Sequence, residues 1–142
     1  MNKRLLPLAL VPALVACAPV MQTKAPTQLT ISVNYITGPI QAGVDNPVLA
    51  AIVSIAPTAP ATGKNYQPWR AEEIERNSVV LRSHPTSINP TIFALSNYPQ
   101  EMSWNVISSG GTTTVTATYS SAYAAAAQYV FDQLDKKFSR VK

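Results

Sequence analysis

The pattern of apolar and polar residues predicts strands in two stretches of the chain, by alternation in residues 29–36 and by strand-like composition in residues 78–83. In residues 29–36 the alternation places four apolar side chains on one face, namely Leu29, Ile31, Val33 and Tyr35. In residues 78–83, Val79 and Leu81 share one face and lie opposite Val80 and Arg82. A period of two is typical of a half-buried strand. We therefore expect a strand in each stretch, the first ending at Gly38 and Pro39.

The clearest local pattern lies in residues 102–119, where two strand-like runs flank Gly110 and Gly111. Both glycines can adopt the positive φ that a two-residue hairpin turn requires. If Ser109 faces Thr112, three apolar pairs fall on one face: Val106 with Val115, Trp104 with Ala117, and Met102 with Tyr119. The other face then carries a row of threonines, Thr112, Thr114, Thr116 and Thr118. Turn and pattern agree, which predicts a hairpin with this register.

Residues 120–142 predict a C-terminal helix, capped by Ser120 or Ser121. Its apolar stripe has helical spacing and comprises Tyr123, Ala127, Val130, Phe131, Leu134, Phe138 and Val141. Such a stripe must be buried against a surface, and the apolar face of the hairpin provides one. The expected fold is a two-layer α+β sandwich, with an antiparallel sheet of about four strands and helices on one side.

Three segments give weaker signals. Residues 47–56 could form either a helix, capped by Asn46 with Pro47 in its first turn, or a strand, which their β-branched residues favour. Residues 68–76 predict a two-turn helix, since acidic residues come early and Arg76 comes last. Residues 89–96 predict a single helical turn.

The N-terminus has the features of a secretory signal peptide. A basic head of four residues precedes twelve uncharged residues, 5–16, too few for the roughly 20 that a membrane-spanning helix needs. The run ends in Leu14-Val15-Ala16-Cys17, which resembles the lipobox of bacterial lipoproteins. That resemblance implies cleavage between Ala16 and Cys17 and a thioether from the Cys17 sulfur to diacylglycerol. The alternative is a cleaved signal peptide with an unmodified cysteine.

The resemblance also implies how the chain is organised and where it is located. We expect a signal peptide at 1–16, a lipidated tether at 17–28 and one small α+β domain at 29–142. Cys17 is the only cysteine, so the domain depends on its core rather than on disulfides. Ala18, in place of an aspartate, favours the outer membrane, with the domain facing the periplasm. Loss of Lys3 and Arg4 would lower the net charge from +4 to +2, which argues against a nucleic-acid partner.

Candidate catalytic residues are few. His84, beside Ser83, is the only histidine, and a catalytic triad requires a nucleophile, a base and an acid that meet in space. Glu72, Glu73 and Glu75 are better explained as a solvated helix face than as an acid/base set. One histidine without a carboxylate cluster does not make a zinc site. We expect neither enzyme activity nor a metal or cofactor.

Three groups of residues are candidates for binding. The uncharged row Thr112, Thr114, Thr116 and Thr118 suits contact with a protein, including strand addition at a sheet edge. Tyr66 and Trp69 could stack on a glycan, although core packing is the alternative for Trp69. Lys136, Lys137, Arg140 and Lys142 could contact an anionic surface, or could only complement the helix C-terminus.

The leading hypothesis is a non-enzymatic envelope lipoprotein that binds a protein partner as an accessory component of an assembly. The alternative is a direct binder of peptidoglycan or lipopolysaccharide.

Overall fold

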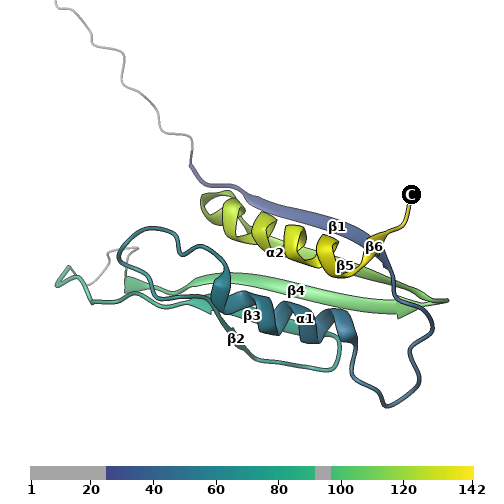
Figure 1. The fold of residues 1–142 in the computed structure, drawn as a ribbon. Helices are drawn as coiled ribbons and strands as arrows, with labels where there is room; N and C mark the ends of the chain where they lie inside the picture. Colours follow the sequence, from purple (N-terminus) through teal and green to yellow (C-terminus); the bar gives the residue numbers. More distant parts are fainter. Residues whose placement is uncertain (1–24, 92–96) are drawn as a thin grey trace, which may run out of the picture.

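The computed structural model describes residues 25–91 and 97–142, which form an antiparallel sheet with both helices on the same face (Figure 1). Within these residues the sheet has six strands in the order β2-β3-β4-β5-β1-β6. The expected α+β sandwich is confirmed, with two more strands than expected. The elements are β1 (Gln28–Ile36), α1 (Pro47–Ile55), β2 (Arg70–Glu72), β3 (Ser78–Ser83), β4 (Gln100–Ser109), β5 (Thr112–Ser120), α2 (Ala124–Lys137) and β6 (Ser139–Arg140), with 3-10 turns η1 (Ala56–Thr58) and η3 (Ser121–Tyr123).

The hairpin of β4 and β5 has the predicted register. Ser109 faces Thr112, and the three apolar pairs behind them face one another as expected. Gly110 and Gly111 have φ values of 59° and 84°, so the turn uses the positive φ that favours glycine. The apolar members of these pairs are all buried beneath the helices.

The predicted strands β1 and β3 are also confirmed. β3 pairs with β4, and its alternation places Val79, Leu81 and Ser83 in the interior. β1 pairs with β5 along its whole length, which makes β5 an inner strand. On the helix-facing side of β1, Tyr35 is fully buried, whereas Leu29 and Ile31 remain 36% and 37% exposed. The apolar face of β1 is therefore covered at one end only.

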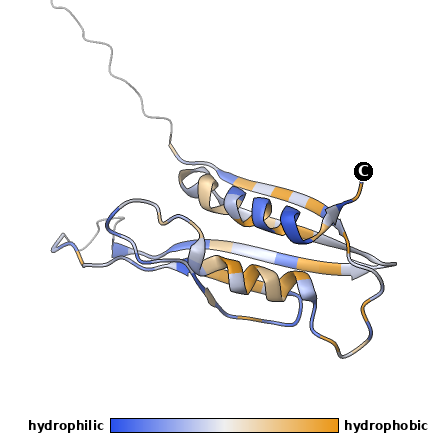
Figure 2. Cartoon of the chain, viewed as in Figure 1, coloured by the Kyte–Doolittle hydropathy of each residue, from blue (hydrophilic) through white to orange (hydrophobic). Residues whose placement is uncertain are grey.

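Of the two alternatives for residues 47–56, the favoured strand is wrong and the helix is correct, because residues 47–55 form helix α1. The Asn46 side chain accepts a hydrogen bond of 2.9 Å from the Val48 backbone N–H, and Pro47 occupies the first turn. Val48, Ile52 and Ile55 then point into the core with helical spacing. Figure 2 shows α1 as the more apolar helix, and its burial against α2 and β3 outweighs the strand preference of its β-branched residues.

The predicted helix at 68–76 is wrong as well. Arg70–Glu72 form strand β2, which pairs with β3 through Ala71 opposite Leu81. The acidic residues that suggested a helix N-terminus lie instead beside Arg82 of β3. Pairing with an arginine across the sheet therefore explains this charge pattern better than a helix dipole.

The C-terminal helix ends earlier than predicted. Phe138 leaves α2 with extended φ and ψ of −132° and 141°, and Ser139–Arg140 become strand β6 beside β1. Val141 lies outside the helix and is largely exposed, so it does not belong to the apolar stripe. The other residues of the stripe are buried or partly buried; for example, Phe131 packs on Trp104 with ring centroids 5.0 Å apart.

At the beginning of the helix, Ser120 caps the preceding turn η3 by accepting a hydrogen bond from the Ala122 backbone N–H. The predicted turn after Asn89 falls on residues 92–96, outside the described residues.

Candidate functional site: the outer face of the sheet

The sheet has one face that carries no helix. We use "outer face" for the side of β1, β5 and residues 103–109 of β4 that points away from α1 and α2 (Figure 1). Among the described residues, no helix or strand covers it. The strand registers assign to it Thr30, Ser32, Asn34, Ile36, Ser103, Asn105, Ile107, Ser109, Thr112, Thr114, Thr116 and Thr118. None of these side chains is charged; the next residue of β4 on the same side is Glu101, which pairs with Arg82. The predicted threonine row therefore lies at the centre of a wider neutral surface that ends before Glu101.

Hydrogen bonds between side chains hold this surface in place. Thr114 donates to Asn34 Oδ1 at 2.8 Å, and the hydroxyls of Ser32 and Thr116 are 2.9 Å apart. The hydroxyls of Thr30 and Thr118 are 3.2 Å apart. β-branched threonines have few rotamers even before such bonds form. The outer face is therefore largely preorganised, and a partner would lose little side-chain entropy by docking on it.

Two isoleucines add apolar contact area to the outer face. Ile36 faces Thr112 across the β1–β5 pair, and Ile107 faces Thr114 across the β4–β5 pair. They are 55% and 58% exposed. Sequence reasoning missed both because it considered the threonine row alone, although the alternation in each strand would have identified them. Exposed apolar groups within a polar surround are typical of protein-contact surfaces.

At the other end of the sheet, charged residues form a network around Arg82. Its guanidinium lies 3.3 Å from Glu72, 2.6 Å from Glu73 and 2.9 Å from Glu101. These carboxylates raise the pKa of Arg82. The prediction that Glu72, Glu73 and Glu75 form a solvated helix face is therefore wrong, since two of them pair with Arg82.

His84 extends this network without forming a catalytic dyad with its neighbour. Its Nε2 lies 2.8 Å from Glu72 Oε1, and this hydrogen bond, assisted by Arg82, lowers the pKa of Glu72. Ser83 is fully buried, and its hydroxyl donates to the Gln67 carbonyl instead. Ser83 and His84 therefore point to different surroundings, as their opposite faces on a strand require. The network is best explained as a structural brace between β2, β3 and β4.

The proposed glycan contact at Trp69 is contradicted by its burial. Trp69 is 0% exposed, its Nε1 donates to the Pro60 carbonyl at 3.1 Å, and its ring packs on Tyr123 at 5.4 Å. Tyr66 is partly exposed, and its hydroxyl donates to the Tyr98 carbonyl at 3.5 Å. The two residues do not form an exposed stacking platform. Trp104, expected in the core, is buried there.

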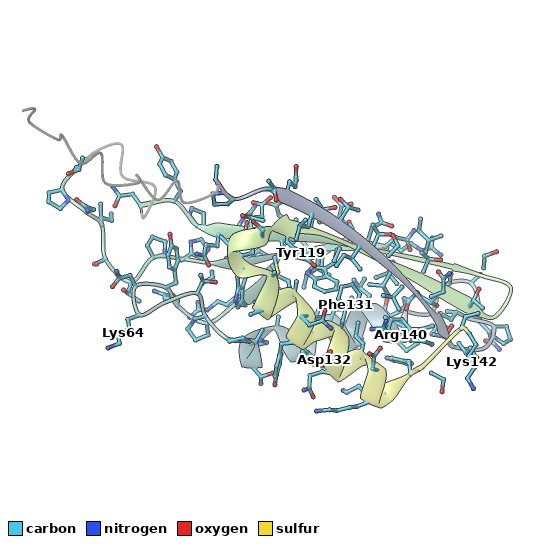
Figure 3. The ribbon with its side chains drawn as sticks, turned by 90° about the horizontal axis from the view of Figure 1, so that it is seen from above. Lys64, Tyr119, Phe131, Asp132, Arg140 and Lys142 are labelled. Carbon is cyan, nitrogen blue, oxygen red and sulfur yellow. The ribbon has the colours of Figure 1, made fainter. Side chains whose placement is uncertain are left out.

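The basic residues near the C-terminus follow one another around the end of α2. Lys136 and Lys137 are exposed in its last turn, and Arg140 and Lys142 lie beyond it (Figure 3). Arg140 forms two hydrogen bonds with Asp135, at 2.7 and 2.8 Å. These bonds lower the pKa of Asp135 and raise that of Arg140. Part of the expected cationic patch is therefore neutralised within the fold, and its contact with an anionic surface stays a prediction.

The remaining expectations concern metals and the membrane. Across residues 25–91 and 97–142, no three His, Cys, Asp or Glu side chains lie close enough together to hold a metal ion. In the same part of the chain, no helix has the length and apolar character needed to span a bilayer. Ala16 and Cys17 lie outside the described residues, so signal cleavage and lipidation stay predictions.

Comparison with known proteins gave no match: no protein-family model fits the chain, and no curated protein is detectably similar to it in sequence. Function must therefore be inferred from the residues and their geometry.

Proposed function

We propose that this protein is a membrane-anchored bacterial envelope lipoprotein that binds another protein through the outer face of its sheet. It would act as a non-enzymatic accessory component of an envelope assembly. The observation that carries the proposal is the asymmetry of the sheet: both helices pack on one face, and the outer face of β1, β4 and β5 is neutral and uncovered.

The composition of the outer face supports contact with a protein. Docking on it would remove no charged side chain from water, so the desolvation penalty is smaller than for a charged surface. Ile36 and Ile107 supply apolar area, and the threonine and serine hydroxyls supply hydrogen-bonding groups around them. Apolar area surrounded by polar groups is common in protein interfaces, and here the two isoleucines lie toward the hairpin end of the outer face.

The N-terminal sequence supports the location. Lipid on Cys17 would anchor the chain, and Ala18 favours the outer membrane with the domain in the periplasm. β1 begins at Gln28. The roughly ten residues between Cys17 and β1 span at most about 35 Å when fully extended. The domain would therefore stay near its membrane, and its partner must reach it there.

Binding of peptidoglycan or lipopolysaccharide is less well supported. The aromatic half of that hypothesis needs an exposed Trp69, and Trp69 is fully buried. The cationic half retains the exposed Lys136, Lys137 and Lys142 but loses Arg140, which is engaged by Asp135.

Crosslinking in intact cells, followed by affinity purification and mass spectrometry, tests the proposal. We expect one protein partner at stoichiometric yield with the wild type, and its loss when Thr114→Lys and Thr116→Lys are combined. Ala125→Lys combined with Gln128→Lys is the matched control, since it adds the same two charges at exposed positions of α2 on the opposite layer. Cys17→Ser tests the anchor and should also abolish capture. Capture that survives both threonine substitutions, in a variant that accumulates normally, would rule out the outer face.

A further inference from the structure

We propose that the free edge of β1 pairs with β1 of a second copy of this protein, which joins the two sheets into one. The "β1 edge" is the backbone of residues 28–33 on the side away from β5. Within the described residues, β6 pairs with β1 only at Tyr35 and Ile36, and residues 28–33 have no strand beside them on that side. This inference concerns the edge of the sheet and does not depend on the function proposed for its outer face.

The backbone groups of this edge point outward in a regular pattern. Asn34 accepts a hydrogen bond of 2.9 Å from the Val141 backbone N–H, so its carbonyl points away from β5. Thr37 donates to Gly111 on the other side. Successive residues of a strand point their N–H and C=O groups to opposite sides. Gln28, Thr30 and Ser32 therefore direct theirs to the β1 edge.

The opposite edge of the sheet is protected, which makes the openness of β1 significant. β2 has only three residues, two of them charged, and the residue that follows it, Glu73, has a φ of 47°. Short length, charge and an abrupt bend are common ways to prevent edge-to-edge pairing. In contrast, residues 28–36 contain neither charge nor proline. An open edge without such protection is expected to be occupied by another strand.

The β1 edge is complementary to itself. In an antiparallel pair, facing residues point to the same side of the sheet. Apolar residues must therefore face apolar residues if the helix-facing side is to exclude water. If Thr30 faces Thr30 of the second copy, Leu29 faces Ile31 of that copy and Gln28 faces Ser32. The outward backbone groups then form about six hydrogen bonds across the two-fold axis.

This register also avoids β6. Moving the axis to Ile31 would bring Thr27 of the second copy opposite Tyr35, where Arg140 already pairs. With the axis at Thr30, Thr27 lies opposite Val33 instead, so the second strand stops before β6.

Exposure and charge favour a second copy as the occupant. Leu29 and Ile31 are more than one third exposed at this edge, and the pairing would cover both from each copy. A charged edge would repel its own copy, whereas this one is neutral. The contact is small, and interfaces below about 1,200 Å² are typical of weak complexes. We expect a dimer that dissociates on dilution.

Disulfide trapping of the lipidated full-length protein in intact cells tests this pairing. Facing, hydrogen-bonded residues of an antiparallel pair have Cα atoms about 5.5 Å apart, within the range of a disulfide. Thr30→Cys should therefore give a disulfide-linked dimer under mild oxidation, verified with two differently tagged copies. Ser103→Cys, exposed on β4 away from this edge, should give little, and the wild type none.

Two additional substitutions, each made in the Thr30→Cys protein, distinguish loss of strand pairing from loss of folding. Ile31→Lys puts a charge on the apolar side of the edge. Ser32→Pro removes an N–H that points outward, together with the hydroxyl that pairs with Thr116, so Ser32→Ala, which keeps the N–H, is its control. Ile31→Lys and Ser32→Pro should each lower the dimer yield at least about tenfold, a change of about 1.4 kcal/mol, while monomer levels stay normal. Combined Thr114→Lys and Thr116→Lys should leave the yield unchanged, which separates this inference from the proposed function. Equal trapping from positions 30 and 103, or trapping unaffected by both edge substitutions, would overturn it.

Discussion

Thr114 of β5 donates a hydrogen bond of 2.8 Å to Asn34 Oδ1 of β1, and this bond lies near the centre of the outer face. Two further hydroxyl pairs continue along the same two strands, Ser32 with Thr116 and Thr30 with Thr118. Together they form a ladder of neutral side chains that needs no charged group for its stability. The same ladder that joins β5 to β1 thus gives the outer face its fixed shape.

Thr114→Val should lower the free energy of unfolding by about 0.5–1.5 kcal/mol, because Asn34 Oδ1 loses a donor and gains only water in return. Equilibrium unfolding in urea measures this difference. Ser103→Ala removes a hydroxyl from an exposed position of the same face and should cost less. Equal losses in the two variants would show that the ladder does not stabilise the fold.

Trp69→Ala should destabilise the domain by about 3–5 kcal/mol, because it removes a fully buried ring from its contact with Tyr123. Thermal unfolding followed by circular dichroism measures the loss. Trp69→Phe should retain most of the packing and therefore most of the stability. Cosedimentation with purified peptidoglycan sacculi should not change in Trp69→Phe; a clear drop in the folded variant would restore the glycan hypothesis.

Asp135→Asn should flatten the acid dependence of stability. Asp135 accepts hydrogen bonds from Arg140 and from the Tyr35 hydroxyl, and these lower its pKa in the folded protein. A lowered pKa stabilises the fold above the ordinary aspartate pKa, and that contribution is lost as the pH falls through the folded value. The wild type should therefore lose more stability than Asp135→Asn between about pH 7 and about pH 3.

The matched control for this prediction is Asp132→Asn, one turn earlier on α2. Asp132 accepts a hydrogen bond from Gln128 rather than from an arginine. Urea unfolding at several pH values should give Asp132→Asn a profile close to that of the wild type. If Asp135→Asn has the same profile as well, the Asp135–Arg140 pair contributes nothing measurable.

Gly110→Val should cost about 1–2 kcal/mol, because Gly110 has a φ of 59° and a side chain there collides with the backbone. Gly110→Asn is the control, since asparagine tolerates this conformation in hairpin turns. Urea unfolding of the two variants should differ by most of the valine penalty. Equal stabilities would mean that the turn does not require positive φ.

Segments that the sequence predicted correctly have local patterns that agree with their tertiary surroundings. In the hairpin, the Gly110–Gly111 turn and the alternation of β4 and β5 specify the same register, and no distant residue is needed to choose it. The apolar stripe of α2 required only an apolar surface of matching size, which this hairpin provides.

The errors arose where long-range contacts decide the conformation. The charge pattern of residues 70–76 resembles a helix until Arg82 of the neighbouring strand is placed beside Glu72 and Glu73. Ser139–Arg140 become strand β6 only because Tyr35 and Ile36 offer a partner edge. In α1, the Asn46 cap was visible in the sequence, but the sequence did not show whether the cap or the strand preference of the β-branched residues would decide the conformation.

In the candidate site too, local patterns were predicted correctly and long-range contacts were not. Alternation alone placed Thr112, Thr114, Thr116 and Thr118 on one face, as the register of β5 confirms. That β1 pairs with β5, and so extends this row into a neutral surface with Ile36, could not be read from either strand alone. Trp69 was misjudged because its burial depends on Tyr123 of a distant segment.

Site-specific photocrosslinking in intact cells tests the central claim most directly. A photoreactive amino acid at position 116 places the probe in the outer face, and one at position 125 places it on the exposed side of α2. We predict a single crosslinked partner protein, distinct from a second copy, from position 116, and none from position 125. No crosslink from position 116, or the same products from both positions, would contradict docking through the outer face.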